Sequence, residues 1–158
     1  MSTSPLQLKS CYFTSINLST EPAHADWNNE NVQVEISVDC KPREGDPLQW
    51  FIFLKVAINP KGEGKSPFKG NIGAMGVFNV ASTWTPENRE RLVYVNGSGI
   101  LYTSVREMVS ILAGRTLYGP LWLPTLSFYE KFMAEEANKA KLQSPAEAPP
   151  PPPSPQPA

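Results

Sequence analysis

Residues 32–40, VQVEISVDC, alternate strictly between apolar and polar side chains. Because successive side chains of a strand point to opposite faces, this pattern predicts a strand with one buried face and one solvated face. A second run, WFIFLKVAIN at residues 50–59, is almost continuously apolar, which is typical of a central strand covered on much of both faces. The stretch between these runs, KPREGDPLQ, holds two prolines, a glycine and several charges, so it is expected to be a loop.

Two further strands complete the predicted sheet, and helices follow it. Residues 11–18 are rich in β-branched and aromatic side chains, and residues 69–80 form a strand pattern interrupted by glycines, which usually mark a bulge or a close backbone approach. From Ser98 to Ala113 apolar residues recur at helical spacing, with Gly114 as the stop. A second helix is predicted to begin near Ser127. The fold class is therefore α+β, a four-stranded antiparallel sheet followed by two helices.

The chain ends in a region of different composition. Eight of the last 14 residues are proline, including a run at residues 149–153. Such a sequence cannot pack a core and is expected to stay extended, mostly in the polyproline II conformation. We therefore predict a flexible N-terminus at residues 1–8, one folded domain at 9–141 and a disordered proline-rich tail at 142–158. For this tail, composition favours a solvated segment over a docking motif.

Composition also excludes several functional classes. With 14 basic and 15 acidic residues the formal net charge is −1, so the chain lacks the positive field needed to bind nucleic acid or anionic membranes. No apolar run is long enough to span a bilayer, and the N-terminal MSTSPLQLKSCYF lacks the layout of a secretory signal. Cys11 and Cys40 are the only cysteines. They could meet on adjacent strands, but we favour core packing, as reduced thiols of a cytoplasmic protein.

No catalytic or metal-binding constellation emerges from the sequence. NPKGEGKS ends like a phosphate-binding loop, but Asn59 stands where that motif needs its first glycine, and Ser66-Pro67 leads into a strand pattern. His24 is the only histidine, which excludes a multi-histidine metal site and leaves one candidate base for a catalytic triad. Glu35 and Asp39 share one exposed strand face, whereas acid–base catalysis needs two carboxyl groups in contrasting environments. We therefore expect no enzyme, no metal and no cofactor.

One segment is irregular and yet strongly apolar. GRTLYGPLWLPTLSF, residues 114–128, joins the two predicted helices and combines glycines and prolines with leucine, tyrosine, tryptophan and phenylalanine. These apolar side chains either close the core or offer an apolar surface to another molecule. Because the predicted sheet and first helix already supply a large core, we favour a groove between this segment and the sheet. Apolar burial is strong and weakly specific, which suits a protein that binds unfolded segments.

The order of these elements and several local matches resemble SecB, a family of bacterial export chaperones, over about residues 8–135. CYFTSINL followed by EPAHADW resembles the first strand and crossover of the family, with Trp27 at its usual tryptophan. GVFNV at 76–80 resembles the end of the fourth strand, and ILYTSVREMVS at 100–110 resembles the first long helix. The spacing from Arg115 to Phe128 resembles the loop that connects the helices. The shared order of these matches makes the resemblance specific.

The resemblance implies a homotetramer assembled from two dimers, with the first helix at the interface between them. It also implies that extended client segments bind in apolar grooves between the connecting loop, the second helix, the crossover and the second strand. The implied client-binding residues are Trp27, Val32, Val34, Ile36, Leu117, Tyr118, Leu121, Trp122, Leu123, Leu126 and Phe128. For Val34 and Ile36, plain core packing is an equal alternative, whereas for Tyr118 and Trp122 we favour the groove.

The chain departs from the exporters of this family in one respect. They pass clients to the SecA motor through an acidic sheet face and a polar, charged tail, whereas the matching positions here hold Ser15, Ser19 and Asn71, with Lys69 at a usual leucine. Loss of carboxylates weakens attraction to a basic docking surface, which argues against contact with SecA. We therefore favour an ATP-independent holdase dedicated to an antitoxin client. A general export chaperone and a non-chaperone ligand-binding or structural α+β protein are the alternatives.

Overall fold

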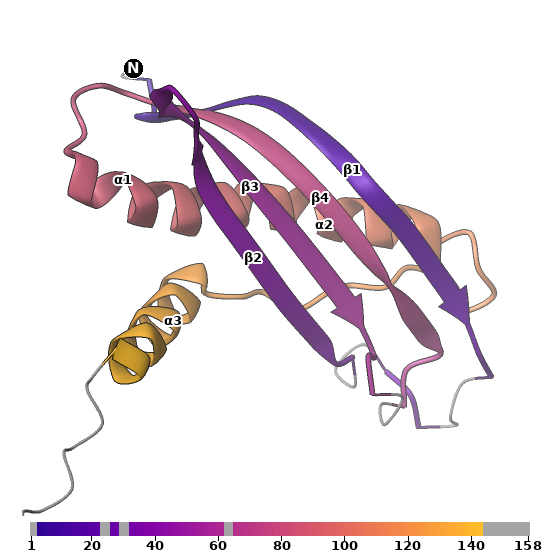
Figure 1. The fold of residues 1–158 in the computed structure, drawn as a ribbon. Helices are drawn as coiled ribbons and strands as arrows, with labels where there is room; N and C mark the ends of the chain where they lie inside the picture. The colour runs from indigo at the N-terminus through magenta and orange to yellow at the C-terminus, as the bar shows by residue number, and fades with distance from the viewer. Residues whose placement is uncertain (1–2, 23–25, 29–31, 62–64, 144–158) are drawn as a thin grey trace, which may run out of the picture.

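The computed structural model describes residues 3–22, 26–28, 32–61 and 65–143, and these contain one four-stranded sheet (Figure 1). The strands are β1 (Leu6–Thr20), β2 (Val34–Arg43), β3 (Asp46–Ile58) and β4 (Phe68–Val80). Their order across the sheet is β1-β4-β3-β2, so β1 and β2 are its two edges. Every neighbouring pair is antiparallel, which confirms the predicted sheet.

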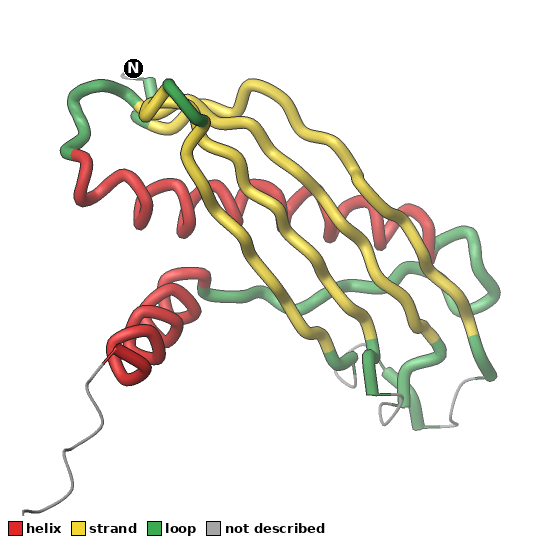
Figure 2. Tube along the Cα trace, viewed as in Figure 1, coloured by secondary structure: helices red, strands yellow, loops and turns green. Residues whose placement is uncertain are grey.

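Helices follow the strands. A short helix α1 (Pro86–Leu92) runs through a π-helical segment η2 (Val93–Gly97) into α2 (Ser98–Ala113), and together they form one rod along one side of the sheet (Figure 2). Helix α3 (Phe128–Gln143) lies beside the β2 edge (Figure 1). The α+β class and the two predicted helices are confirmed, and α2 ends at Gly114 as expected.

The rod begins earlier than the helical spacing predicted. Ser98 is the first residue of α2, as predicted, but it is fully buried and the rod runs through it without a break from η2. The glycine before it hid this continuity, because Gly97 lowers helix propensity. The packing explains that glycine, since a Cβ at Gly97 would collide with Cδ1 of Ile52 on β3. The rod therefore approaches the sheet more closely here than a side chain would allow.

The core lies between the rod and the inner face of the sheet. Along β3 every second residue is buried, and these residues are Trp50, Ile52, Leu54, Val56 and Ile58. Phe51 and Phe53, which alternate with them, are half-buried on the opposite, outer face. The strand is central, as predicted, and its outer face is covered only in part. Its apolar run instead reflects cross-strand packing on the outer face, where Phe51 lies opposite Val77 and Phe53 opposite Met75.

The stretch KPREGDPLQ is not the predicted loop but a tight hairpin. Strand β2 continues to Arg43, β3 begins at Asp46, and Gly45 occupies the turn with a φ of +78°. Glycine adopts this left-handed conformation without steric cost. Pro42 is tolerated because β2 is an edge strand, where a missing N–H need not interrupt a ladder.

Several other expectations concern single residues. Cys11 lies on β1 and Cys40 on β2, at opposite edges of the sheet, so the idea that they meet on adjacent strands is wrong. Both are free thiols, half-buried against the core. Strand β1 includes residues 6–8, and Leu6 is buried. His24 and the tail from residue 144 lie outside the described residues. No described helix is long and apolar enough to cross a membrane.

Candidate functional site

The segment that connects α2 to α3, residues 115–127, begins with turns at residues 115–118 and is then extended as it runs across the strands on the side of the rod (Figure 2). We call it the connecting segment. Its apolar side chains divide between the core and the surface. Leu121 and Leu123 are 0% and 1% exposed, whereas Trp122 between them is 58% exposed and Leu126 is 37% exposed. This alternation is the pattern of a strand, although the segment pairs with no strand of the described sheet.

Two side chains of α2 hold this backbone in place. The hydroxyl of Tyr102 donates to the carbonyl of Pro124 at 2.7 Å, and Nε of Arg106 donates to the carbonyl of Leu123 at 3.1 Å. Tyr102 and Arg106 are one helical turn apart, so they meet neighbouring peptides of an extended chain. Prolines at 120 and 124 carry no N–H, which lowers the number of donors that need a partner. The connecting segment is thus held by side chains of α2 and not by backbone pairing with a strand.

The start of the connecting segment packs into an aromatic cluster. The rings of Trp27, Phe68 and Tyr118 meet edge to face, with centroids 5.9 to 6.4 Å apart. Phe68 is fully buried, and Trp27 and Tyr118 are half-buried against the core. Leu117, directly before Tyr118, is 93% exposed. Tyr118 therefore anchors the segment, while Leu117 projects into solvent.

The end of the connecting segment forms one wall of an apolar cavity. Val34 and Ile36 of β2 line it on one side, and residues 126–128 together with Glu130 and Lys131 line the other. Its volume is about 320 Å³. Phe128 closes its floor against the core, where its ring meets that of Tyr102 with centroids 5.7 Å apart. The charged side chains of Glu130 and Lys131 stand at its rim.

A second, smaller cavity of about 180 Å³ continues along the same two elements. It lies between Val38 to Cys40 of β2 and Phe132 to Lys139 of α3, with Glu90 and Tyr94 from the rod. Strand β2 and helix α3 are thus the two walls of one groove, which we call the β2–α3 groove. It is apolar at the Val34 end and partly charged at the Cys40 end.

At the charged end of the β2–α3 groove, two side chains have raised pKa values. Burial, and then the carboxylates of Glu90 and Asp39, raise the pKa of Cys40 to about 12. Burial also raises the pKa of Tyr94, with Glu135 adding to the effect. Both groups therefore stay protonated at neutral pH, and neither a thiolate nucleophile nor a phenolate is present there.

The structure separates the predicted binding residues into groups. Val34, Ile36, Leu126 and Phe128 line the apolar end of the β2–α3 groove. Trp27, Val32 and Tyr118 are half-buried against the core, Leu121 and Leu123 are part of it, and Leu117 and Trp122 are exposed. The rod residues Glu90 and Tyr94, which line the same groove, were missed because α1 was not predicted. A helix-start signal was available there, with Pro86 at the first turn and Glu87 following.

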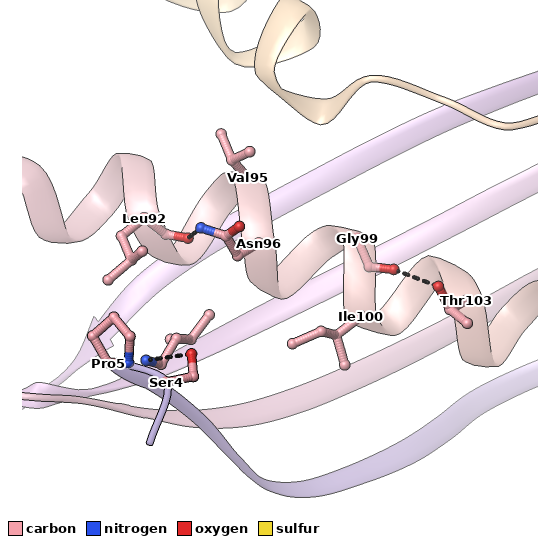
Figure 3. Close-up of a pocket in the computed structure, with 9 residues that line it drawn as sticks. Ser4, Pro5, Leu92, Val95, Asn96, Gly99, Ile100 and Thr103 are labelled. Atoms are coloured by element: carbon pink, nitrogen blue, oxygen red, sulfur yellow. Dashed lines mark hydrogen bonds between the residues drawn. The ribbon is translucent and has the colours of Figure 1, made fainter. Parts of the chain in front are cut away.

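A larger cavity of about 530 Å³ lies elsewhere, between the start of β1 and the rod (Figure 3). None of the predicted binding residues lines it. The polar side chains that the rod contributes bond within the rod, since Asn96 donates to the carbonyl of Leu92 at 3.1 Å and Thr103 to that of Gly99 at 3.0 Å. Val95 and Ile100 add apolar surface beside them. This cleft therefore offers apolar area next to the β1 edge rather than a convergent polar site.

Comparison with known proteins places the chain among chaperones. The protein-export protein SecB of Dechloromonas aromatica (strain RCB) is 28% identical over 120 residues, which is 76% of this chain and 77% of the relative. The SecB-like chaperone Rv1957 of Mycobacterium tuberculosis, solved in complex with a ChAD peptide from the HigA1 antitoxin, matches with a TM-score of 0.55. It is 17% identical and covers 78% of this chain and 91% of its own, so that likeness shows a shared fold. The family model described as preprotein translocase subunit SecB matches residues 2–139, and the chain therefore belongs to the SecB family.

Proposed function

We propose that this protein is an ATP-independent holdase that binds an extended apolar segment of an unfolded client in the β2–α3 groove. The observation that carries the proposal is the alternation in the connecting segment. Leu121 and Leu123 anchor it in the core, while Trp122 is left exposed and Leu126 lines the apolar cavity. Exposed apolar surface of this kind marks a site for a partner rather than a completed core.

The geometry of the groove favours an extended client. Strand β2 pairs with β3 on one side only, and its other edge faces α3. An edge strand offers backbone N–H and C=O groups to an incoming extended chain. Alternate side chains of that chain would meet Val34, Ile36 and Val38, so apolar residues at every second position would be bound best.

The proposed client is an antitoxin. Strands β1 and β4 contain no aspartate or glutamate, and Ser15, Ser19 and Asn71 lie on the outer face of these strands. The Ser19 hydroxyl donates to the carbonyl of Lys69 at 3.1 Å, so a positively charged residue ends this strip. Without carboxylates, this β1–β4 part of the outer face attracts a basic docking partner weakly, which supports a role outside export. The antitoxin peptide bound by the Mycobacterium tuberculosis relative supports the same class of client.

The second candidate function is a general export chaperone. It is supported by the export role named for the Dechloromonas relative. Purification of the tagged protein from its own host, without crosslinking, separates the two. One dominant small partner is expected for the dedicated chaperone. A broad set of secretory precursors together with SecA would instead show that the protein is a general export chaperone.

We further propose that the protein acts as a cytoplasmic homotetramer, a dimer of dimers. Apolar side chains remain exposed on the β1 edge and on α2, namely Leu8, Tyr12, Ile16, Ile100 and Ile111. A monomer that left these exposed would be prone to associate. Light scattering on the eluting protein measures the assembly, and a monomeric mass at micromolar concentration would contradict it.

The binding site is tested by charge placed on exposed apolar side chains of the connecting segment, of which Leu126 lines the groove. Trp122→Asp combined with Leu126→Asp should abolish suppression of client aggregation, because carboxylates would replace apolar contacts. Tyr118 is unsuitable for this test because it packs on buried Phe68. The matched control is Leu117→Asp, at a residue that is 93% exposed and does not line the groove. If the double variant suppresses aggregation as well as the wild type, with unchanged circular dichroism, the groove is not the client site.

A further inference from the structure

The outer face of the sheet carries an apolar cluster at its centre. Phe51 lies opposite Val77 and Phe53 opposite Met75, while Tyr12 of β1 flanks Met75 on the other side. The phenylalanines, the methionine and the valine are half-buried, and Tyr12 is 56% exposed. The rod packs on the other face of the sheet, so no described helix covers this one (Figure 1). We call these five residues the outer-face patch.

A cavity of about 260 Å³ adjoins the patch beside the ring of Phe53. It exists because Gly73 of β4 has no side chain between Ser15 on β1 and Lys55 on β3. Ser15, Ser37 and Asn71 also line it. Aromatic rings next to hydrogen-bond donors are the surface that proline-rich segments recognise, since such segments offer proline rings and carbonyl acceptors but few N–H groups.

Helix α3, which precedes the proline-rich tail, meets β2 through Lys139. Lys139 in the last turns of α3 lines one cavity together with Asp39 and Cys40 of β2. Asp39 also lines the cavity on the outer face, so a single strand separates Lys139 from that cavity. The 15 residues from 144 to 158 lie beyond the family match, which ends at residue 139.

The length of this tail is sufficient to cover the patch. At about 3.1 Å per residue, an extended polyproline segment of this length reaches on the order of 45 Å. Three spacings of roughly 4.8 Å separate β2 from β1 across the sheet, which is about 14 Å. The tail can therefore pass over the edge of β2 and cross the whole outer face.

We propose that residues 144–158 fold back over β2 and pack on the outer-face patch of the same chain. Glu147 is the one charged side chain in this stretch, so the tail can cover Phe51 and Phe53 without burying unpaired charge. Lys41, which stands over the Phe53 ring at 5.2 Å, and Lys55 lie at the margin of the patch, where they suit that carboxylate. This inference does not use the β2–α3 groove and stands independently of the proposed function.

The tail and the patch are tested in the full chain with ¹³C-labelled methionine methyl groups. Met75 reports on the patch, whereas Met108 on α2 is an internal control on the other side of the sheet. One variant replaces each proline from 149 to 153 by serine, which removes the rings, and a second combines Pro150→Asp with Pro152→Asp. Both changes lie beyond the described fold, so the sheet itself is not altered. The Met75 signal should shift in both variants while the Met108 signal stays in place.

Two outcomes would overturn the proposal. An identical Met75 signal in the wild type and both variants would mean that the tail does not touch the patch. A difference that disappears when the wild type is diluted until it is monomeric would mean that a tail covers the patch of another copy, so that the fold-back within one chain is wrong. A difference that persists in the monomer is the expected result.

Discussion

Strand β2 and the connecting segment form a contrasting pair near the β2–α3 groove. Both are extended, and both alternate between inward and outward side chains. Strand β2 is held by a ladder to β3 that runs from Val34 opposite Ile58 to Pro42 opposite Trp50. The connecting segment has no such ladder and depends on two buried leucines and on hydrogen bonds from Tyr102 and Arg106.

This difference gives the two regions different local stability. A strand in a ladder opens with the sheet, because its hydrogen bonds form and break together. The connecting segment can be released by the loss of a few separate contacts, while the sheet stays folded. One region of the site is therefore rigid and the other adjustable, which suits a site that receives clients of differing side chains.

The largest expected effect comes from the inward leucines. Leu121→Ala and Leu123→Ala should each lower the free energy of unfolding by about 2–5 kcal/mol, because each leaves a cavity in the core. Urea denaturation measures this loss. The control is Leu117→Ala, which should change the value by no more than about 0.5 kcal/mol. If all three variants were equally stable, the segment would not be anchored in the core.

The next effect concerns the anchors on α2. Tyr102→Phe leaves the carbonyl of Pro124 without its donor and should cost about 1 kcal/mol. Hydrogen exchange should rise in residues 115–127 and stay unchanged in β2, because the ladder does not depend on this contact. Thr103→Val is the control, since its hydroxyl bonds within α2 to Gly99. Equal exchange changes in both regions would contradict their independence.

The same contrast explains how much of the fold was predictable. In β2 the alternation of Val34, Ile36 and Val38 is uninterrupted, and the strand was found from its sequence. The connecting segment alternates as well, but Pro120 and Pro124 are signals of a loop, and its order comes from side chains of α2 that are distant in sequence. Local patterns carry no information on such contacts.

The candidate site was predictable in the same uneven way. An apolar segment with no regular structure correctly indicated exposed side chains, and Trp122 and Leu126 are such residues. The sequence could not separate them from Leu121 and Leu123, because inward and outward leucines are chemically identical. The lining from α1 was missed, since it required the position of a helix that Gly97 and Gly99 concealed.

The smallest effect is a dependence of stability on pH, which separates Cys40 on β2 from Tyr102, the α2 residue that holds the connecting segment. Burial raises the pKa of Cys40 on β2 from 9.0 to about 12, and burial, opposed by Arg106, raises the pKa of Tyr102 from 10.0 to about 12. In the unfolded chain each group releases its proton near its ordinary value. The folded protein then binds more protons than the unfolded chain, so stability falls as pH rises, from about 9 for Cys40 and from about 10 for Tyr102.

Urea midpoints measured from pH 8 to pH 11 should therefore resolve the two contributions. Between pH 9 and 10 Cys40→Ala should lose less stability than the wild type, whereas Tyr102→Phe should follow the wild type. Above pH 10 the stability of Tyr102→Phe should fall less steeply than that of the wild type. In the wild type, ionised Tyr102 can no longer donate to the carbonyl of Pro124, whereas the variant has no such bond to lose. Each variant is the control for the other, since the remaining groups titrate alike in both. If stability fell with pH in parallel for all three proteins, neither Cys40 nor Tyr102 would be buried from water. The packing described around both side chains would then be incorrect.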